Sequence, residues 1–355
     1  MTPPFADAAP PGRTPPALDL PAVLTRATTV ETPGPPVPPG PRVNPWHVAG
    51  AVPVRLPDRE RRLLEGLWRG TGTHRLPDGT ASGIRQRPVP SAGAAYPVQT
   101  HLVVGRSGGG ELEAGRYVYD HERATLLRRD EAREEGAGWT GPAASTPGTR
   151  LILTVQPGRS FGRYRHRCWP LWIADVAYAL AAVEFLLATR AMPVTLGPSG
   201  RIRELLGVAP GADHERWLAR GLVPEIPLAA LDLPAAWTVA ADRSEALGAR
   251  RSPALREFED RVPRVRDRRT EGVARASGQG WVRGAARVRA WSVASGASAP
   301  DVATALWSAH RGAASECYEA ARSGRWRCRP VSGFAARDGR WIVHALAMLP
   351  GRDRP

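Results

Sequence analysis

The segment Phe161–Met192 reads FGRYRHRCWPLWIADVAYALAAVEFLLATRAM, and the rest of the chain is organised around it. Between Leu171 and Thr189 its only charged residues are Asp175 and Glu184. A helix that is apolar nearly all round is buried on every side. The two acids argue against a membrane span, which needs about 20 consecutive apolar residues. The sequence therefore predicts a central core helix and no membrane association.

A tyrosine stands among arginines just before this helix. Tyr164 has Arg163, Arg165 and Arg167 as neighbours, and a helix N-terminus adds partial positive charge. A phenol normally titrates near ~10, and nearby cations favour its ionised form. The pattern predicts Tyr164 as an acid or base whose pKa the arginines lower. The alternative is that the arginines form a solvated surface run and that Tyr164 only packs.

The basic residues of the chain are all arginine. Lys+Arg number 49 against 34 Asp+Glu, which gives a net charge of +15 over 355 residues, and the sequence contains no lysine. This excludes a Schiff-base lysine, a lysine general base and a phosphate-loop lysine. Basic chains attract nucleic acid or acidic peptides. Because the arginines are spread through all regions, we do not expect nucleic acid as a partner.

The cysteines give no sign of a metal site or a disulfide framework. Cys168, Cys317 and Cys328 form no Cys-x-x-Cys pair, so we expect free thiols in a reducing compartment and no bound metal. No basic segment followed by an apolar core opens the chain, so we expect no signal peptide and a cytoplasmic location. Residues 1–45 are proline-rich and predict extended or disordered chain.

From Trp46 onward the pattern mixes helices and strands. Residues 58–68 predict an amphipathic helix, followed by RGTGTHR (69–75), whose amides and arginines could hold a phosphate or form a plain surface loop. The small-residue turn 90–94 would let backbone approach a flat ligand. Without regular βαβ alternation, an α+β domain is expected. Predicted strands cover 97–104, 115–120, 124–127, 150–156 and 193–197, and a short helix covers 201–207.

In their order, these motifs resemble nitroreductase-like flavoproteins, and within them the azoline dehydrogenases that act on ribosomally made peptides. The matching pieces are RPVPSAGAAYP (87–97), GRYVYD (115–120), the arginine–tyrosine pair Arg163–Tyr164 with Arg167 and Asp175 after it, MPV (192–194) and LLG (205–207). The similarity covers roughly residues 58–225.

The resemblance implies an FMN-binding α+β domain, usually a homodimer with the flavin at the subunit interface. It implies catalytic roles for Tyr164, Arg163 and Arg167. Arg163 replaces the lysine of the family's lysine–tyrosine pair, and arginine stays protonated, so Tyr164 is left as the base. The cofactor-binding residues that the resemblance implies are Arg69, Thr71, Arg87, Pro90, Ser91, Ala92, Gly93 and Gly197.

The C-terminal region, residues 226–355, fits the family less well than residues 46–225. Strands near 228–239, helices at 254–262 and 299–321, and a hairpin formed by 328–334 and 340–348 around Asp338-Gly339 are expected. Two interpretations stay open. The region is a degenerate second half-copy of the first domain, or it is an unrelated accessory domain.

The function expected from this resemblance is FMN-dependent oxidation of thiazolines or oxazolines to azoles in a ribosomally synthesised peptide. Its partners would be a precursor peptide with an acidic leader and the cyclodehydratase that makes the rings. Two alternatives stay open. The missing lysine of the pair allows a flavin-free scaffold of a peptide-modifying complex, and the fold also allows a general nitro or quinone reductase that uses a nicotinamide donor.

Overall fold

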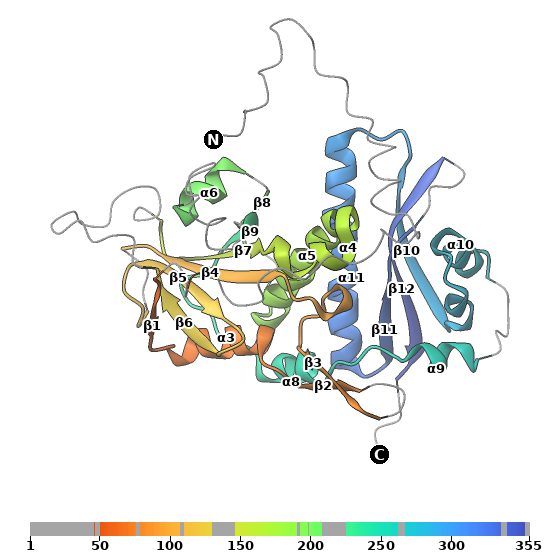
Figure 1. Ribbon diagram of the computed structural model, residues 1–355, viewed down its shortest axis with the longest axis horizontal. Coiled ribbons are helices and arrows are strands. Elements are labelled where there is room, and N and C mark those ends of the chain that lie inside the picture. The colour runs from red at the N-terminus through yellow and green to blue at the C-terminus, as the bar shows by residue number, and fades with distance from the viewer. Residues whose placement is uncertain are drawn as a thin grey trace, which may run out of the picture.

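A long buried helix, α5, lies between a large sheet and the C-terminal half of the protein (Figure 1). The computed structural model describes residues 46, 50–75, 79–106, 110–129, 146–189, 192–197, 199–207, 225–261, 267–334 and 339–351. The proline-rich residues 1–45 and the predicted turn residue Asp338 lie outside the described residues.

Helix α5 spans Cys168–Leu186, and most of its side chains are buried. Its two acids both have partners within the protein: Asp175 binds the turn at Ser91, and Glu184 forms an ion pair with Arg311 of α11. The helix is long and apolar enough to cross a membrane, but 72% of its most apolar window is buried inside the protein. The prediction of a central core helix is confirmed.

The main sheet has seven strands in the order β1-β6-β5-β4-β7-β9-β8, and every neighbouring pair is antiparallel. The central strand β4 is buried along its whole length, as expected for a strand covered on both faces. The strands are β1 (Val52–Val54), β4 (Val98–Val104), β5 (Gly115–Asp120), β6 (Thr125–Arg128), β7 (Thr149–Val155), β8 (Val194–Leu196) and β9 (Ile226–Asp232).

Helices cover the two faces of this sheet. On one face α5 packs with α3 (Asp58–Trp68), which buries Leu63, Leu64 and Leu67. On the other face α6 (Gly200–Leu206) packs its apolar side on β4, β7 and β9. Helix α6 ends at Gly207 in the left-handed conformation, as helix C-termini commonly do.

The C-terminal half forms a second layer around α11 (Ala299–Ser323), which packs along α5 (Figure 1). A three-stranded antiparallel sheet, β10-β12-β11, covers the far side of α11. Its strands are β10 (Arg287–Ala294), β11 (Trp326–Val331) and β12 (Arg340–Pro350), and the smaller helices are α8 (Ala241–Ala249), α9 (Leu255–Glu259) and α10 (Arg268–Ser277), followed by the 3₁₀ turn η4 (Gly280–Gly284).

The expected α+β class is confirmed, but several elements were not predicted. Gly72–Arg75, expected as part of a loop that holds a phosphate or lies on the surface, is strand β2 and pairs with β3 (Ala81–Gln86). Strands β1 and β10 and helices α8 and α10 were also missed. The remaining short elements are α4 (Phe161–Tyr164), η1 (Ala92–Ala94), η2 (Pro157–Arg159) and η3 (Arg165–Arg167).

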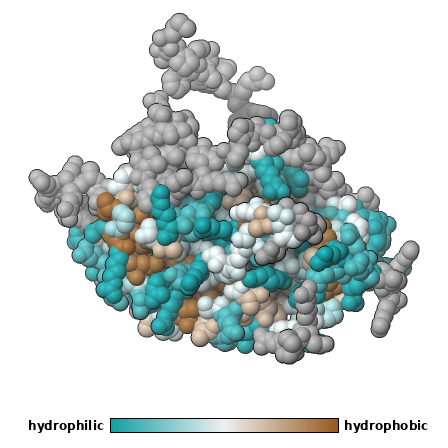
Figure 2. Space-filling model, turned by 60° about the horizontal axis from the view of Figure 1, so that its bottom comes forward, coloured by the Kyte–Doolittle hydropathy of each residue, from teal (hydrophilic) through white to brown (hydrophobic). Residues whose placement is uncertain are grey.

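The lower surface of the molecule is mixed in character. Figure 2 turns the bottom of Figure 1 toward the viewer and shows hydrophilic residues around separate hydrophobic patches.

The large apolar side chains that are most exposed in the described residues include Trp169 and Phe161, at the start of the α4–α5 segment. Single exposed apolar residues are normal on protein surfaces, so these two define no interface by themselves.

Candidate active site

The turn between Arg87 and Tyr96 adopts an unusual backbone conformation. Gly93, Ala94 and Tyr96 all have positive φ angles, of 55°, 53° and 46°. This region is unfavourable for residues other than glycine, and such strain persists only where surrounding structure holds it. The turn therefore depends on contacts from other elements.

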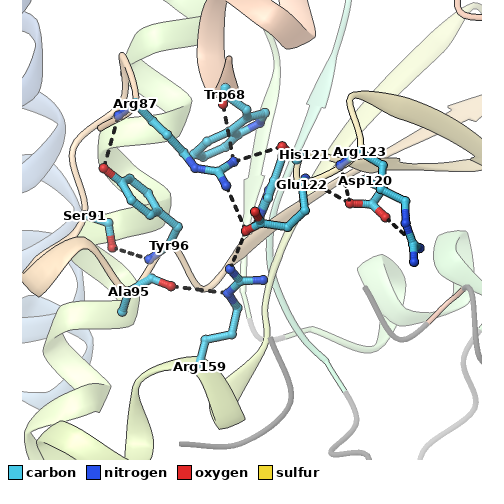
Figure 3. Close-up of polar contacts among 10 residues, drawn as sticks. All are labelled: Trp68, Arg87, Ser91, Ala95, Tyr96, Asp120, His121, Glu122, Arg123 and Arg159. Carbon is cyan, nitrogen blue, oxygen red and sulfur yellow. Dashed lines mark hydrogen bonds and ion pairs between the residues drawn. The ribbon is translucent and has the colours of Figure 1, made fainter. Parts of the chain in front are cut away.

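One set of these contacts is a polar hub in which Glu122, itself 37% exposed, joins two buried arginines (Figure 3). The Glu122 carboxylate binds the guanidinium groups of Arg87 at 2.8 Å and Arg159 at 2.9 Å, and both arginine side chains are buried. Arg159 also donates to the carbonyl of Ala95 at 3.2 Å, and the Arg87 amide donates to Tyr96 Oη at 3.2 Å. One carboxylate thus fixes the beginning and the end of the turn.

We expect Glu122→Gln to lower the free energy of unfolding by about 2 kcal/mol, because two buried guanidinium groups lose a charged acceptor. Urea unfolding of both proteins measures this. Glu113→Gln is the matched control: Glu113 pairs with Arg128 at 2.7 Å but is 78% exposed, and exposed pairs contribute about 0–1 kcal/mol. Equal losses in both variants would show that the hub does not hold the turn.

Asp175 of α5 holds the turn from the other side. Its carboxylate accepts hydrogen bonds from Ser91 Oγ at 3.0 Å and from the Ala92 amide at 3.1 Å. Ser91 Oγ in turn accepts from the Tyr96 amide at 3.0 Å. Burial raises the pKa of Asp175 to about 7, and the two hydrogen bonds only partly offset that effect. The core helix and the turn are therefore coupled through a carboxyl group that can change protonation near neutral pH.

Tyr164 lies directly against Gly93. A Cβ atom added at Gly93 would lie 2.1 Å from Tyr164 Oη, so a larger residue there would have to displace the phenol. Burial raises the pKa of Tyr164, and Arg163 and Arg167 only partly oppose this effect. Both arginines act in the predicted direction, but the net pKa of Tyr164 is raised, because desolvation outweighs the cations. Exposed Arg163 instead donates to the Gly93 carbonyl at 3.4 Å.

The turn, the start of α5 and the C-terminal half enclose a cavity of about 320 Å³, which we call the central cavity. Its lining includes six of the residues predicted from the sequence: Pro90, Ser91, Ala92, Gly93, Tyr164 and Arg167. The other residues around it are Leu171, Ala174, Asp175, Tyr178, Ser252, His310, Arg329, Pro330, Ser332 and His344. Both halves of one chain therefore supply its walls.

The remaining predicted cofactor residues lie elsewhere. Arg69 and Thr71 line a separate cavity of about 590 Å³ between α3 and α8. Arg87 points into the hub. Gly197 follows β8, where its Cβ would meet the Ser199 amide at 2.8 Å and the Pro227 carbonyl at 3.4 Å. The structure thus does not bring these four residues to the central cavity.

Five polar residues that line the cavity were not predicted as site residues from the sequence: Asp175, Tyr178, His310, Arg329 and His344. For Asp175 the signal was present, since a lone acid in an apolar helix needs a buried partner. The other four come together only through packing of α5, α11, β11 and β12. Arg329 is half-buried, burial lowers its pKa, and it donates to the Pro253 carbonyl at 2.8 Å.

The cysteines take no part in this site. All three are buried free thiols, and burial raises the pKa of Cys168 to about 11, so it is not a reactive thiolate. Among the described residues, no three His, Cys, Asp or Glu side chains gather into a metal site.

Comparison with solved structures identifies the fold. A nitroreductase from Anabaena variabilis is similar over 84% of this chain and 90% of its own, with a TM-score of 0.56 and 16% identity. The chain has the nitroreductase-like fold. A match of that length is longer than residues 46–225, so it includes part of the C-terminal half.

A second similar structure is a complex of the E. coli microcin synthetase McbBCD with truncated pro-MccB17 bound. It covers 62% of this chain and 85% of its own, with 14% identity and a TM-score of 0.29, and it adds nothing to the fold assignment. No protein-family model and no curated protein sequence matches the chain.

Proposed function

We propose that the protein is an FMN-dependent dehydrogenase that oxidises azoline rings to azoles in a ribosomally made peptide. The observation that carries this proposal is the central cavity, where a small-residue turn, the half-buried Tyr164 and two arginines meet within a nitroreductase-like fold. The motif order RPVPSAGAAYP, GRYVYD and Arg163–Tyr164 supports the azoline branch.

The residues of the central cavity fit an aromatic, anionic cofactor. The volume of about 320 Å³ lies within the usual ligand-site range of about 300–1,000 Å³. Pro90, Ala92 and Ala174 offer apolar walls, while Arg167 and Arg329 offer the positive charge that a phosphate needs. We therefore assign flavin binding to this cavity, with the phosphate held by Arg329 and Arg167.

In the proposed reaction, side chains of the protein accept the proton and stabilise the negative charge. The flavin, when bound, accepts the hydride that leaves the ring. In the proposal, Tyr164 Oη takes the proton from the ring carbon α to the carbonyl, and the hydride leaves the adjacent ring carbon. The ring thus loses two hydrogens and gains one double bond. Arg167 stabilises the negative charge that develops. Arg163 holds the Gly93 carbonyl and with it the position of the phenol.

The substrate in this proposal is a ring-bearing precursor peptide, with an acidic leader that suits a net charge of +15. The resemblance also implies cyclodehydratase partners and a homodimer. The central cavity has walls from both halves of one chain, so flavin binding in the proposal does not need a second copy.

Mass spectrometry tests the activity. The protein is incubated with FMN and a thiazoline-containing peptide, with and without an acidic leader. We expect a loss of two hydrogens per ring, faster when the leader is present. A flavin-loaded protein that reduces nitroaromatics with a nicotinamide donor but leaves every azoline unchanged would instead support a general reductase.

Arg329 lines the central cavity and Arg69 lines the cavity between α3 and α8, so substituting each one tests which cavity binds FMN. We expect Arg329→Met to weaken FMN binding by about 10–100-fold, because a hydrogen bond to a charged group contributes about 1.5–3 kcal/mol. Arg69→Met is the matched control and should leave the FMN affinity unchanged. Titration of apoprotein with FMN measures both. The reverse result would place the phosphate in the cavity between α3 and α8.

A further inference from the structure

A cavity of about 640 Å³ lies at the C-terminal end of α11, between α8 and strand β11 (Figure 1). Among the described residues, Glu257 is the only acid that lines it. Five arginines line it as well, and we call it the arginine groove: Arg250, Arg251, Arg322, Arg325 and Arg327. Because Arg251, Arg322 and Arg325 are exposed, the groove is open to solvent and accessible to a charged partner.

Acids of the protein neutralise two of these arginines. Arg322 forms an ion pair with Glu319 at 2.8 Å, and Arg327 forms one with Glu257 at 2.7 Å. These two guanidinium groups therefore add little net attraction for an anion.

The other three arginines have no carboxylate partner among the described residues. Arg250 donates to the Pro88 carbonyl at 3.3 Å and Arg251 to the Gly248 carbonyl at 2.7 Å, and these acceptors are uncharged. The C-terminus of α11 offsets the equivalent of about half a charge. Arg250, Arg251 and Arg325 thus leave the groove with an excess of about two positive charges or more.

The arginine groove adjoins the central cavity. Ser252 lines both. On β11, Arg327 lines the groove and Arg329 lines the central cavity. Residues two apart on a strand face the same side and are about 7 Å apart. Arg250 also donates to the carbonyl of Pro88, just before the turn of the central cavity. A chain that lies in the groove can therefore extend into the central cavity.

The other walls of the groove suit an extended peptide. Ala246 and Ala249 of α8, Ala320 and Ala321 of α11, and Trp326 of β11 form an apolar surface between the arginines. Strand β11 is at the edge of its sheet, and edge strands offer backbone groups to an extended chain. Apolar walls, unpaired guanidinium groups and a strand edge together favour a peptide with acidic side chains.

We propose that the arginine groove binds an acidic segment of the peptide whose ring enters the central cavity. That this peptide is the substrate rests on the proposed function, whereas binding in the groove needs no flavin. Carboxylates of the segment pair with Arg250, Arg251 and Arg325, which have no acid of their own. An extended chain covers about 3.4 Å per residue, so the acidic segment begins about three residues from the ring.

Fluorescence anisotropy with the full-length protein, without added flavin, tests the binding. The probe is a labelled peptide that alternates glutamate and alanine, and its glutamine analogue is the control peptide. We expect the double variant Arg251→Gln/Arg325→Gln to bind the glutamate peptide about tenfold more weakly, because two charge pairs are lost. Raising the salt from about 50 to about 500 mM should weaken wild-type binding more than binding by this variant, since salt screens the pairs.

Arg201→Gln/Arg268→Gln is the matched control. Both arginines are exposed and lie outside the groove, and the change in net charge is the same. We expect this variant to bind like the wild type. Thermal unfolding shows whether the variants are folded. If Arg251→Gln/Arg325→Gln misfolds, Arg325→Gln alone decides the question.

Oxidation of a thiazoline peptide, with and without an acidic segment, separates this proposal from the proposed function. In Arg251→Gln/Arg325→Gln we expect KM to rise about tenfold for the acidic peptide, with kcat unchanged and with no effect on the peptide that lacks acids. Glutamate-peptide binding in the groove without any azoline oxidation would refute the proposed function and keep the groove. Azoline oxidation with an unchanged KM would refute the groove and keep the proposed function.

Equal affinity for the glutamate and glutamine peptides, or equal losses in the two double variants, would overturn the proposal, because the arginines of the groove would then have no particular role. Competition with other anions completes the test. A single-stranded oligonucleotide or inorganic phosphate that displaces the glutamate peptide and binds more tightly would assign the groove to that ligand instead.

Discussion

Tyr164→Phe is expected to lower azoline oxidation by about 10²–10⁴-fold, the usual contribution of general-base catalysis. The phenol faces the central cavity beside Gly93, and phenylalanine keeps the ring while removing the only titratable atom. Flavin content and thermal stability should stay near those of the wild type. Tyr117→Phe is the matched control, because Tyr117 is a buried tyrosine that donates to the Glu113 carbonyl, away from the cavity.

The role of Tyr164 as a base also predicts how the oxidation rate depends on pH. A base acts in its deprotonated form, and burial raises the pKa of Tyr164 above its ordinary value of 10. The ionised fraction therefore rises about tenfold per pH unit up to that pKa. We expect the wild-type rate to increase between pH 7 and pH 9 and the Tyr164→Phe rate not to follow. Oxidation at the wild-type rate by Tyr164→Phe would reduce Tyr164 to a packing residue.

Asp175→Asn is expected to change how stability depends on pH. The folded-state pKa of Asp175 is about 7, against an ordinary value of 3.8. Between these values the folded protein holds a proton that the unfolded chain has released. This contribution to stability is complete below pH 3.8 and is lost as pH rises through 7. Asparagine never ionises, and its amide can still accept from Ala92.

Urea unfolding of both proteins at pH 4.5 and pH 8 measures the effect. The stability of Asp175→Asn relative to the wild type should increase by about 3 kcal/mol between these two pH values, at about 1.4 kcal/mol per pK unit. The other ionisable groups are common to both proteins, so their contributions cancel in the difference. Parallel stability curves would show that Asp175 is ionised in the folded state at both pH values.

The elements with strong local patterns could be predicted from the sequence. Helix α5 stands out because an apolar run of its length has few alternatives, and strands β4, β5 and β7 stand out through their β-branched and aromatic residues. The β2–β3 hairpin was not predicted, because its strands are glycine-rich, polar and exposed, without apolar alternation. Residues 72–75 therefore looked like part of a loop rather than a strand.

Only those residues of the candidate site that belong to short sequence motifs could be predicted. The turn at Pro90–Gly93 and the pair Arg163–Tyr164 carry recognisable motifs, and the fold brings the turn and Tyr164 together. His310 and His344 are far apart in the chain and reach the cavity only because α11 and β12 pack beside α5. The direction of the Tyr164 pKa was also beyond the sequence, since it depends on burial rather than on neighbouring charges.

The visible absorption spectrum of the purified protein tests the central claim, that the central cavity binds FMN, most directly. We expect a yellow protein that releases FMN when it is denatured, or a colourless apoprotein that becomes yellow and retains FMN through gel filtration after reconstitution. Protein that stays colourless after FMN is added would contradict the account and favour a flavin-free scaffold with a nitroreductase-like fold.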